Sequence, residues 1–349
     1  MSEIVEVIRK VAAFADKQES ETFTLADVHF RKGEVYAQSM VGGALEPIEL
    51  ELNCGVNAKK LLKALQAVGK APKFEMVGKQ LKVSKGKSRA KLETSDPKHA
   101  PKLHRPPKGA EWLEVPHLHE ASRLVWAVST DTTRTHIAGV CLSARGLCAT
   151  NGHAAIKLGE ENYCELLGCG EASAPLIPPA VLKNLPNPTF ACLHQGKLYL
   201  AAESKPKAFR SANLYDARFP SMEQVMETGR GQPRLSVDRS ALVDLLKRAR
   251  LSSHSAVLEV KGKRLSVSID DTRPADTLFS FADSVEFTKV SGEVPDGLIS
   301  LNLNYLLPSV ETCSDKQVTL GMLPEAAGSL EPIYVTDGDI EAIMMPMRM

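Results

Sequence analysis

Cysteine and histidine are the residue types best able to act as nucleophiles or to bind a metal, and the chain has seven cysteines and nine histidines. Cys164 and Cys169 are close in sequence, but their spacing is not that of a structural zinc pair. Most other cysteines lie inside apolar runs such as 140–142 and 190–193. Such thiols are typically reduced and buried, so we expect them to serve packing rather than chemistry.

The histidines do not complete a metal or catalytic pattern. His99, His104, His117 and His119 fit no zinc-ligand spacing with the cysteines. The sequence also has no nucleophile elbow, no phosphate-cradling glycine loop and no paired-carboxylate signature. We therefore expect no catalytic residue, no cofactor and no metal. An enzyme that uses histidines and cysteines is kept as an alternative, which a metal analysis of the purified protein would test.

The C-terminal residues 343–349, Ile-Met-Met-Pro-Met-Arg-Met, could bind apolar side chains of a partner. Methionine is flexible and polarizable, so a methionine-rich surface accepts ligands of differing shape. The alternative is an ordinary edge strand that buries every second residue.

Charge is almost balanced overall but is unevenly distributed. The chain has 43 lysines and arginines against 42 aspartates and glutamates, a formal net charge of +1. Basic residues outnumber acidic ones between Lys59 and Lys108, and the reverse holds from Glu325 onward. This pattern suits a protein that offers nucleic acid one surface only. No apolar run approaches the ~20 residues that span a bilayer, and no secretory pattern is present, so we expect a cytoplasmic protein without a membrane partner.

The elements that must position these residues recur three times. Segments with a helical apolar face begin near Ile4, Leu118 and Leu242, roughly 110–125 residues apart, and Asp238 is a plausible N-cap of the third. Each precedes a hairpin signal, two β-rich runs joined at a glycine, in residues 28–36, 140–148 and 257–267.

A second helix follows each hairpin, with Asn57, Pro178–Pro179 and Asn302 as its start signals, and further strands come after it. This order predicts an α+β fold with antiparallel sheets. Joints at 97–107 and 229–233 divide the chain into predicted domains 1–106, 107–231 and 232–349. A chance recurrence of helices and hairpins in one large α+β protein is the alternative.

Several segments resemble bacterial DNA polymerase III beta subunits, the sliding clamps, in the same order. The C-terminal residues 343–349 resemble the family's C-terminus, and Ala149–His153 (Ala-Thr-Asn-Gly-His) resembles its Ala-Thr-Asp-Gly-His. Residues 216–220 resemble its Asp-Gly-Arg-Phe-Pro, and residues 301–307 resemble the start of its last helix. The resemblance covers the last two thirds of the chain well and the first third more weakly.

The resemblance implies three similar clamp-type domains per chain, with antiparallel sheets outside and helices lining a ring that a homodimer closes around double-stranded DNA. It implies no catalytic residue and no cofactor. Partners would be the DNA, contacted independently of sequence, and polymerase and clamp-loader subunits that bind through short peptides. The alternative is a clamp-like scaffold that binds peptides but is not stably loaded on DNA.

The resemblance also implies a partner-peptide pocket between the second and third domains. Its residues, matched by motif, are Ile137, Thr150, Gly152, His153, Pro220, Val225, Asn302, Tyr305, Ile343, Met345, Pro346, Met347, Arg348 and Met349. Relatives usually follow Gly-His with arginine and leucine, whereas this chain has Ala154 and Ala155. We therefore expect a less basic entrance and a different partner preference.

Two further sets follow from the resemblance. Contact with phosphates needs lysine and arginine on rigid elements, and the expected DNA-facing residues are Lys59, Lys63, Lys87, Arg89, Arg123, Arg134, Lys247, Arg248 and Arg250. A solvated helix face is the alternative for each. The dimer interface is expected at Ala90 and Leu92, opposite Leu251. Since Ala90 replaces a larger apolar residue of the family, we expect a weakened ring.

Overall fold

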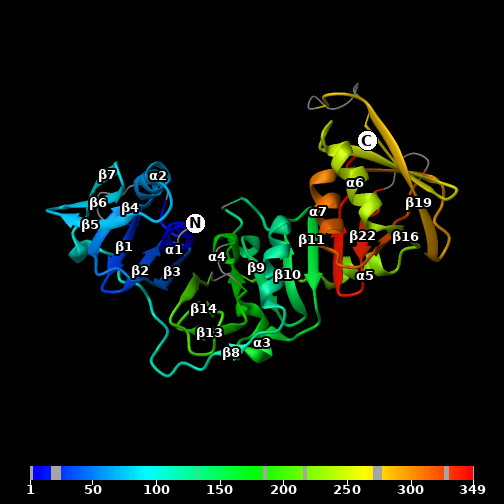
Figure 1. Cartoon of the computed structure of the whole chain (residues 1–349). Helices are drawn as coiled ribbons and strands as arrows, with labels where there is room; N and C mark the ends of the chain where they lie inside the picture. Colours follow the sequence, from blue (N-terminus) through cyan, green and yellow to red (C-terminus); the bar gives the residue numbers. More distant parts are fainter. Residues whose placement is uncertain are drawn as a thin grey trace. The chain divides into compact units, whose positions relative to one another are not determined.

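The computed structural model describes residues 3–16, 25–131, 133–183, 187–214, 218–269, 277–325 and 330–348 (Figure 1). The chain forms two compact units, each described here by itself. Unit 1 comprises residues 1–122, 164–170 and 175–216, and unit 2 comprises residues 123–163, 171–174 and 217–349. The division into three domains, 1–106, 107–231 and 232–349, remains a prediction.

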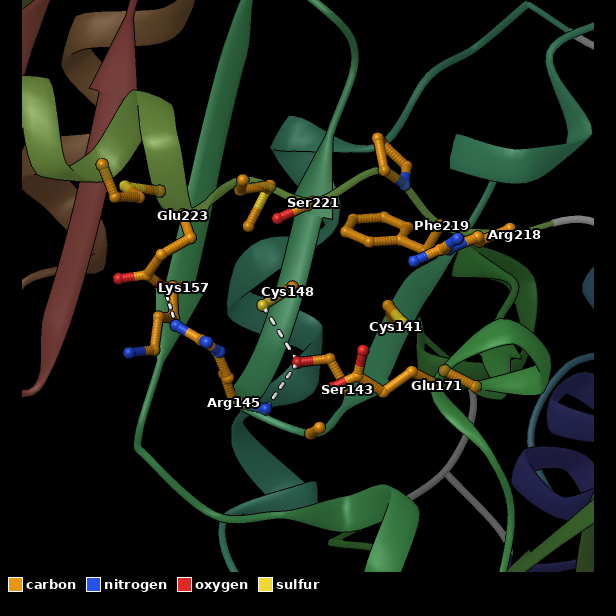
Figure 2. Close-up of a pocket in the computed structure, with 15 residues that line it drawn as sticks. Cys141, Ser143, Arg145, Cys148, Lys157, Glu171, Arg218, Phe219, Ser221 and Glu223 are labelled. Atoms are coloured by element: carbon orange, nitrogen blue, oxygen red, sulfur yellow. Dashed lines mark hydrogen bonds and ion pairs between the residues drawn. The ribbon is translucent and has the colours of Figure 1, made fainter.

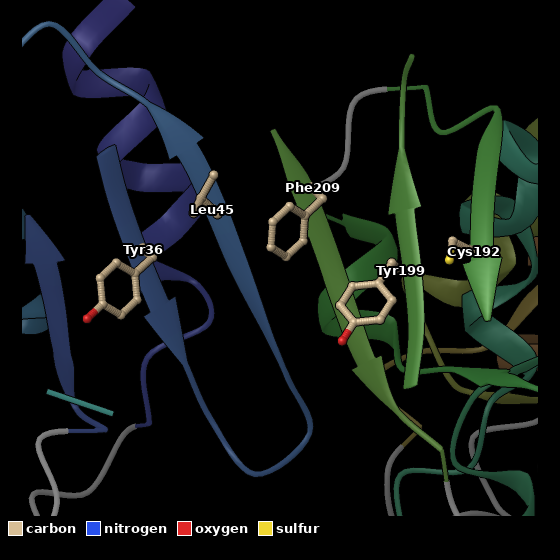
Figure 3. Close-up of a cluster of buried hydrophobic side chains, with 5 residues drawn as sticks. All are labelled: Tyr36, Leu45, Cys192, Tyr199 and Phe209. Carbon is tan, nitrogen blue, oxygen red and sulfur yellow. The ribbon is translucent and has the colours of Figure 1, made fainter. Parts of the chain in front are cut away.

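Unit 1 is built on an 8-stranded antiparallel sheet in the order β4-β1-β2-β3-β15-β14-β13-β8. Its strands are β1 (Asp27–Arg31), β2 (Glu34–Gln38), β3 (Gly42–Pro47), β4 (Asn53–Asn57), β8 (Leu113–Glu114), β13 (Phe190–His194), β14 (Lys197–Ala201) and β15 (Phe209–Asn213). The pairing of β3 with β15 joins the strands of the first predicted domain to those of the second. The buried residues Tyr36, Leu45, Cys192, Tyr199 and Phe209 form one core cluster of this unit (Figure 3).

The remaining elements of unit 1 include two helices and a small second sheet. The helix α1 (Glu3–Ala12) buries its apolar face, and α2 (Ala58–Val68) begins where the Asn57 side chain accepts a 3.0 Å hydrogen bond from Lys60 N. The second sheet runs β5-β6-β7, with strands β5 (Lys73–Val77), β6 (Gln80–Lys85) and β7 (Ser88–Glu93). The short elements are η1 (Pro97–His99), β12 (Leu176–Ile177) and α4 (Pro179–Lys183).

Unit 2 is built on an antiparallel sheet in the order β9-β10-β11-β23-β22-β21-β16-β19-β18-β17-β20. Its strands are β9 (Val140–Ser143), β10 (Gly146–Thr150), β11 (Ala154–Leu158), β16 (Arg234–Asp238), β17 (Ser255–Lys261), β18 (Arg264–Ile269), β19 (Phe281–Ser291), β20 (Gly297–Asn302), β21 (Gln317–Gly321), β22 (Ile333–Thr336) and β23 (Ile340–Met344). The pairing of β11 with β23 joins the second predicted domain to the third.

Two capped helices of unit 2 confirm their sequence signals. Asp238 accepts a 3.0 Å hydrogen bond from Ala241 N at the start of α6 (Arg239–Arg250), and Asn302 accepts one of 2.8 Å from Asn304 N at the start of α7 (Leu303–Thr312). The other helices at unit 2 are η3 (Thr135–Ile137), η4 (Glu171–Ser173) and α5 (Glu223–Arg230); η2 (Leu118–Ala127) and α3 (Tyr163–Leu166) each cross from one unit into the other.

The helix expected to begin near Leu118 is present as η2, which is a 3₁₀-helix and not an α-helix. Its fully buried residues are Leu118, Ala121, Leu124 and Ala127, each three positions apart. This is the periodicity of a helix with three residues per turn, in which positions i and i+3 coincide. Among all described residues, no helix is both long and apolar enough to cross a membrane.

Candidate functional site

A cavity of about 310 Å³ opens in unit 2 where β11 meets β23. It is lined by Arg134, His136, Ile137, Thr150, Gly152, His153, Ala154, Ala155, Pro220, Ser221, Met222, Val225, Ile343, Met344 and Met345. The volume is at the lower end of the ~300–1,000 Å³ typical of ligand pockets. None of these described lining residues is acidic, and most are apolar.

The turn between β10 and β11 is fixed by its own polar groups. The Asn151 side chain accepts hydrogen bonds from His153 N (2.9 Å) and Ala154 N (3.0 Å), and Thr150 Oγ1 donates to Ala154 O (2.8 Å). Gly152 has a φ of +89°, and a Cβ added there would lie 2.7 Å from Arg134 Nη2. The backbone conformation therefore favours glycine at this position, whereas the nearby Arg134 guanidinium ends a flexible side chain that could shift.

The methionine-rich end does not form an edge strand, because β23 pairs with β11 on one side and β22 on the other. Ile343 and Met344 are buried in this interior strand. Beyond it, Met345 N donates to His153 O (2.9 Å) and Met347 N donates to Ser300 O (2.8 Å). Both of these methionine side chains are exposed, as a surface for an apolar ligand requires.

The structure brings most of the predicted pocket residues together. Those that line the cavity are Ile137, Thr150, Gly152, His153, Pro220, Val225, Ile343 and Met345. Tyr305 lies beside it, because its ring stacks on that of His153 with centroids 6.3 Å apart. The Asn302 side chain caps α7. Pro346, Met347 and Arg348 follow β23, and Met349 lies outside the described residues.

Sequence reasoning missed several lining residues. His136, Ser221, Met222 and Met344 are sequence neighbours of predicted residues, so adjacency in the sequence was the available signal. Arg134 was expected to face DNA, but it lines the cavity and donates a 3.0 Å hydrogen bond to Asn151 O. The Arg134 guanidinium therefore contacts the turn, and its contact with DNA stays a prediction.

A second cavity of about 110 Å³, shown in Figure 2, shares the lining residues 220–222 with the first. Arg145 Nη1 and Glu223 Oε2 pair across it at 2.8 Å, and Ser143 Oγ lies 3.4 Å from Cys148 Sγ. Burial raises the pKa of Cys148 to about 11, so the thiol stays protonated at neutral pH and is a poor nucleophile. Nor do the described residues contain a group of three or more side chains that could hold a metal ion.

The predicted DNA-facing residues differ in their solvent exposure and in their polar contacts. Lys59 and Lys63 are exposed on α2, beside an open depression of about 1,020 Å³ that Arg9 and Lys60 also line. Lys87, Arg89 and Arg250 are exposed as well, and Lys247 and Arg248 form exposed ion pairs with Glu311 (2.9 Å) and Asp283 (2.5 Å). Exposed ion pairs of this kind contribute little to stability, so both side chains could pair with phosphates instead. Arg123, by contrast, is half-buried and donates to Thr312 O and Ser314 Oγ.

The predicted interface residues lie on strand edges. Ala90 and Leu92 are half-buried on one face of β7, which among the described residues pairs with β6 alone. Residues 281–286 of β19 pair with β18, and no described strand pairs with their other edge. Free edges of this kind are templates for pairing with another chain.

Leu251 has two apolar neighbours that the sequence did not indicate. Leu251 is 70% exposed at the end of α6, and Leu278 and Phe279 are 77% and 46% exposed. The segments are adjacent because Leu278 N donates to Ser252 O (2.9 Å) and Phe279 N to Ser252 Oγ (3.3 Å). We call Leu251, Leu278 and Phe279 the apolar patch.

The sequence matches no protein-family model and no curated protein. Solved structures do resemble this chain over nearly its whole length. They include the DNA polymerase III beta subunit of Thermotoga maritima (19% identity, TM-score 0.76, covering 99% of this chain and 97% of that one). A sliding clamp of Bartonella birtlesii bound to griselimycin has 16% identity and a TM-score of 0.76, with the same coverage of 99% and 97%.

The Helicobacter pylori beta clamp bound to a DNA ligase peptide is a third similar structure (15% identity, TM-score 0.74, covering 99% of this chain and 98% of that one). Identities this low establish a shared fold and not a shared function. The fold is that of the bacterial sliding clamps, and the expected α+β class with antiparallel clamp-type sheets is confirmed.

Proposed function

We propose that this chain is a non-enzymatic sliding clamp, whose homodimer encircles double-stranded DNA and tethers replication or repair proteins through a short peptide. The observation that carries the proposal is the cavity at the β11–β23 junction. A preformed apolar pocket with a few polar groups is suited to anchoring a peptide side chain. Its apolar walls supply affinity, while His153 and Arg134 can orient a peptide backbone or carboxylate.

Ligands of similar structures support a peptide as the occupant. The Helicobacter pylori clamp binds a DNA ligase peptide, and the Bartonella birtlesii clamp binds griselimycin. The exposed Met345 and Met347 continue the apolar surface beyond the cavity, so a bound peptide would extend along the C-terminal segment. We take the ligase peptide and griselimycin as the two probes of this site.

Ring closure would join β7 of one copy to the free edge of β19 in the other. The strands then continue each other's sheets, and the apolar patch of one copy covers Ala90 and Leu92 of its partner. Phe279 would supply aromatic area that Ala90 lacks. Exposed lysines of α2 would contact phosphates without reading bases, as movement along DNA requires.

The test compares two valine variants of unit 2. Val225→Asp places a charge on the cavity wall, whereas Val290→Asp places the same charge at an exposed position of β19. We expect the first to weaken binding of both probes at least about tenfold, and the second to leave it unchanged, because only the first desolvates a carboxylate against the peptide. Binding of neither probe by the parent chain would refute the peptide site.

A scaffold that binds peptides without staying on DNA is the second candidate. It is favoured by the small side chain of Ala90 at the edge of β7, which gives up apolar contact at the joint. Intact probe binding together with rapid loss from end-blocked duplex DNA would favour the scaffold over the clamp.

A further inference from the structure

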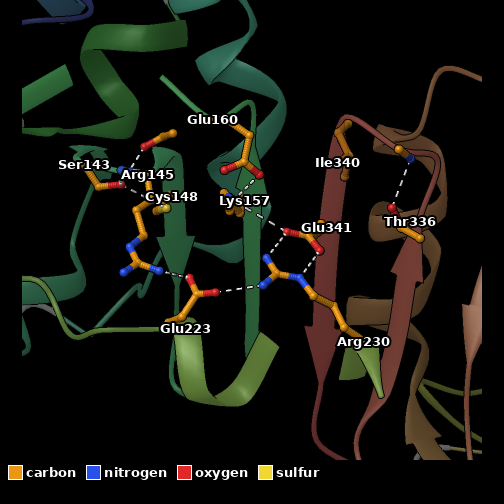
Figure 4. Close-up of polar contacts among 12 residues, drawn as sticks. Ser143, Arg145, Cys148, Lys157, Glu160, Glu223, Arg230, Thr336, Ile340 and Glu341 are labelled. Carbon is orange, nitrogen blue, oxygen red and sulfur yellow. Dashed lines mark hydrogen bonds and ion pairs between the residues drawn. The ribbon is translucent and has the colours of Figure 1, made fainter. Parts of the chain in front are cut away.

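A group of charged residues, of which Lys157 and Glu341 are the most buried, connects α5, β11 and β23 (Figure 4). Arg230 donates to both carboxylate oxygens of Glu341, at 2.6 Å and 2.5 Å, and to Glu223 at 2.8 Å. Lys157 Nζ lies 3.7 Å from the Glu341 carboxylate and 2.5 Å from that of Glu160. Tyr334 also donates its hydroxyl hydrogen to Glu341. We call Lys157, Arg230, Tyr334 and Glu341 the Glu341 cluster.

Glu341 is the acceptor on which the cluster converges, and it is held ionised. The side chains of Lys157 and Glu341 are 6% and 12% exposed, so each charge is costly unless it is paired. Burial on its own would raise the pKa of Glu341. Hydrogen bonds from Arg230 and Tyr334, with the charges of Arg230 and Lys157, nevertheless hold that pKa below its ordinary value.

The cluster is continuous with the cavity along the strands. Glu341 and Lys157 are register partners of β23 and β11, and the next pair on the same face is Ile343 with Ala155, both of which line the cavity. The ion pair therefore fixes the register that forms the cavity floor. A slip of one residue would turn Ile343 away from the cavity.

The cluster also holds the opposite wall. Met222 and Val225 line the cavity at the start of α5, and Arg230 is the last residue of the same helix. At ~1.5 Å per residue, these eight residues span about 12 Å. The bidentate pair of Arg230 with Glu341 thus ties the far end of this short helix to the strand that forms the floor.

We propose that Glu341 is the positioning residue of the peptide site: through Arg230 it fixes the α5 wall, and through Lys157 it fixes the β11 floor. This inference rests on the proposed function. Glu341 does not touch the peptide; it sets the shape of the cavity before the peptide arrives. The cluster joins three of the elements that line the cavity, namely α5, β11 and β23, which is the arrangement expected of a positioning group.

The first test removes the charge or the geometry of the cluster. Among the described residues, Glu341→Gln keeps the side-chain shape but leaves Arg230 paired with Glu223 alone and Lys157 with Glu160 alone. Arg230→Lys keeps the charge but loses the bidentate contact. We expect the ligase peptide and griselimycin to bind about tenfold more weakly to Glu341→Gln and less so to Arg230→Lys. The control is Glu311→Gln, which breaks the exposed pair with Lys247 and should leave binding unchanged.

A second variant separates positioning from stability. The double change Arg230→Met and Glu341→Leu replaces the largely buried pair by apolar side chains, a replacement that is often neutral or stabilising. We expect its Tm to return toward the parent value while probe affinity stays at least about fivefold weaker, because no directional contact holds α5. Affinity that recovers together with Tm would overturn the inference, and so would unchanged affinity in Glu341→Gln. If the parent binds neither probe, the proposed function itself fails.

Discussion

The cavity of unit 2 and the β7 edge of unit 1 are held in opposite ways. Around the cavity, β11 and β23 each have a strand partner on both sides, and every residue of β11 is buried. The β7 strand is the outer strand of a three-stranded sheet, with Ser88, Arg89, Lys91 and Glu93 exposed.

This difference indicates which site needs a second molecule. The cavity obtains its shape from hydrogen bonds and ion pairs within one chain, so a ligand meets a site that is already organised. The edge of β7 and the apolar patch carry groups that no described part of this chain covers and that a second chain could cover. We therefore expect peptide binding by a single subunit and DNA retention by two.

The largest expected effect concerns the proposed dimer interface at the edge of β7. Leu92→Asp would bury an unpaired carboxylate in the joint, which costs several kcal/mol, so light scattering should find monomers at concentrations where the parent is dimeric. Val77→Asp, at an exposed position of β5 in the same sheet, is the matched control. Both variants should bind the peptide probes like the parent. If Leu92→Asp remained dimeric, the dimer interface would not include the edge of β7.

The reverse experiment removes the peptide surface and spares the edge. Deleting residues 345–349 removes Met345 from the cavity and the hydrogen bonds to His153 and Ser300, but leaves β23 complete. We expect at least about a hundredfold loss of probe affinity, or ~2.8 kcal/mol, with an unchanged dimer in light scattering. Full probe affinity in the truncated chain would remove the C-terminal segment from the site.

A third change addresses the DNA surface. Replacing Lys59, Lys63 and Arg89 by glutamate should weaken salt-sensitive DNA binding, because three exposed cations no longer release counterions from phosphate. The log–log salt slope should become shallower by about 3. The control is the same replacement at Lys261, Lys263 and Arg264, which are exposed around the β17–β18 turn. An unchanged slope in the first variant would mean that those side chains face away from DNA.

The smallest expected effects concern how strongly the two subunits of the proposed dimer bind each other. Phe279→Ala removes apolar area from the patch and should weaken the dimer by about 1–3 kcal/mol, whereas Ala90→Phe should strengthen it if the partner's edge covers that position. Sedimentation across a dilution series would measure both dissociation constants. If neither changes, the apolar patch and the β7 edge do not meet in the dimer.

Local signals in the sequence predicted the elements well. Side chains of Asn57, Asp238 and Asn302 cap the helices that their positions indicated, because a cap needs only residues a few positions apart. Most of the pocket also followed from the sequence, since the resemblance covers the segments at Thr150, Pro220 and Ile343. The periodicity near Leu118 did not indicate the type of helix, because the spacings three and four cannot be told apart over ten residues.

Features that depend on strand register could not be predicted. The cluster around Glu341 forms because β11 pairs with β23 in the one register that sets Lys157 opposite it, across more than half of the chain. Phe279 joins Leu251 only through a turn back onto Ser252. Neither contact has a local sequence signal, and Arg134 was assigned to DNA for the same reason.

Topological retention on DNA tests the central claim most directly. The labelled protein is incubated with linear duplex carrying biotin at both ends, the ends are then blocked with streptavidin, and the salt concentration is raised to remove contacts that are only electrostatic. An encircling dimer should stay bound at high salt and leave once a restriction enzyme cuts the duplex, and Leu92→Asp should never be retained. Release of the parent protein at high salt while both ends are still blocked would contradict encirclement.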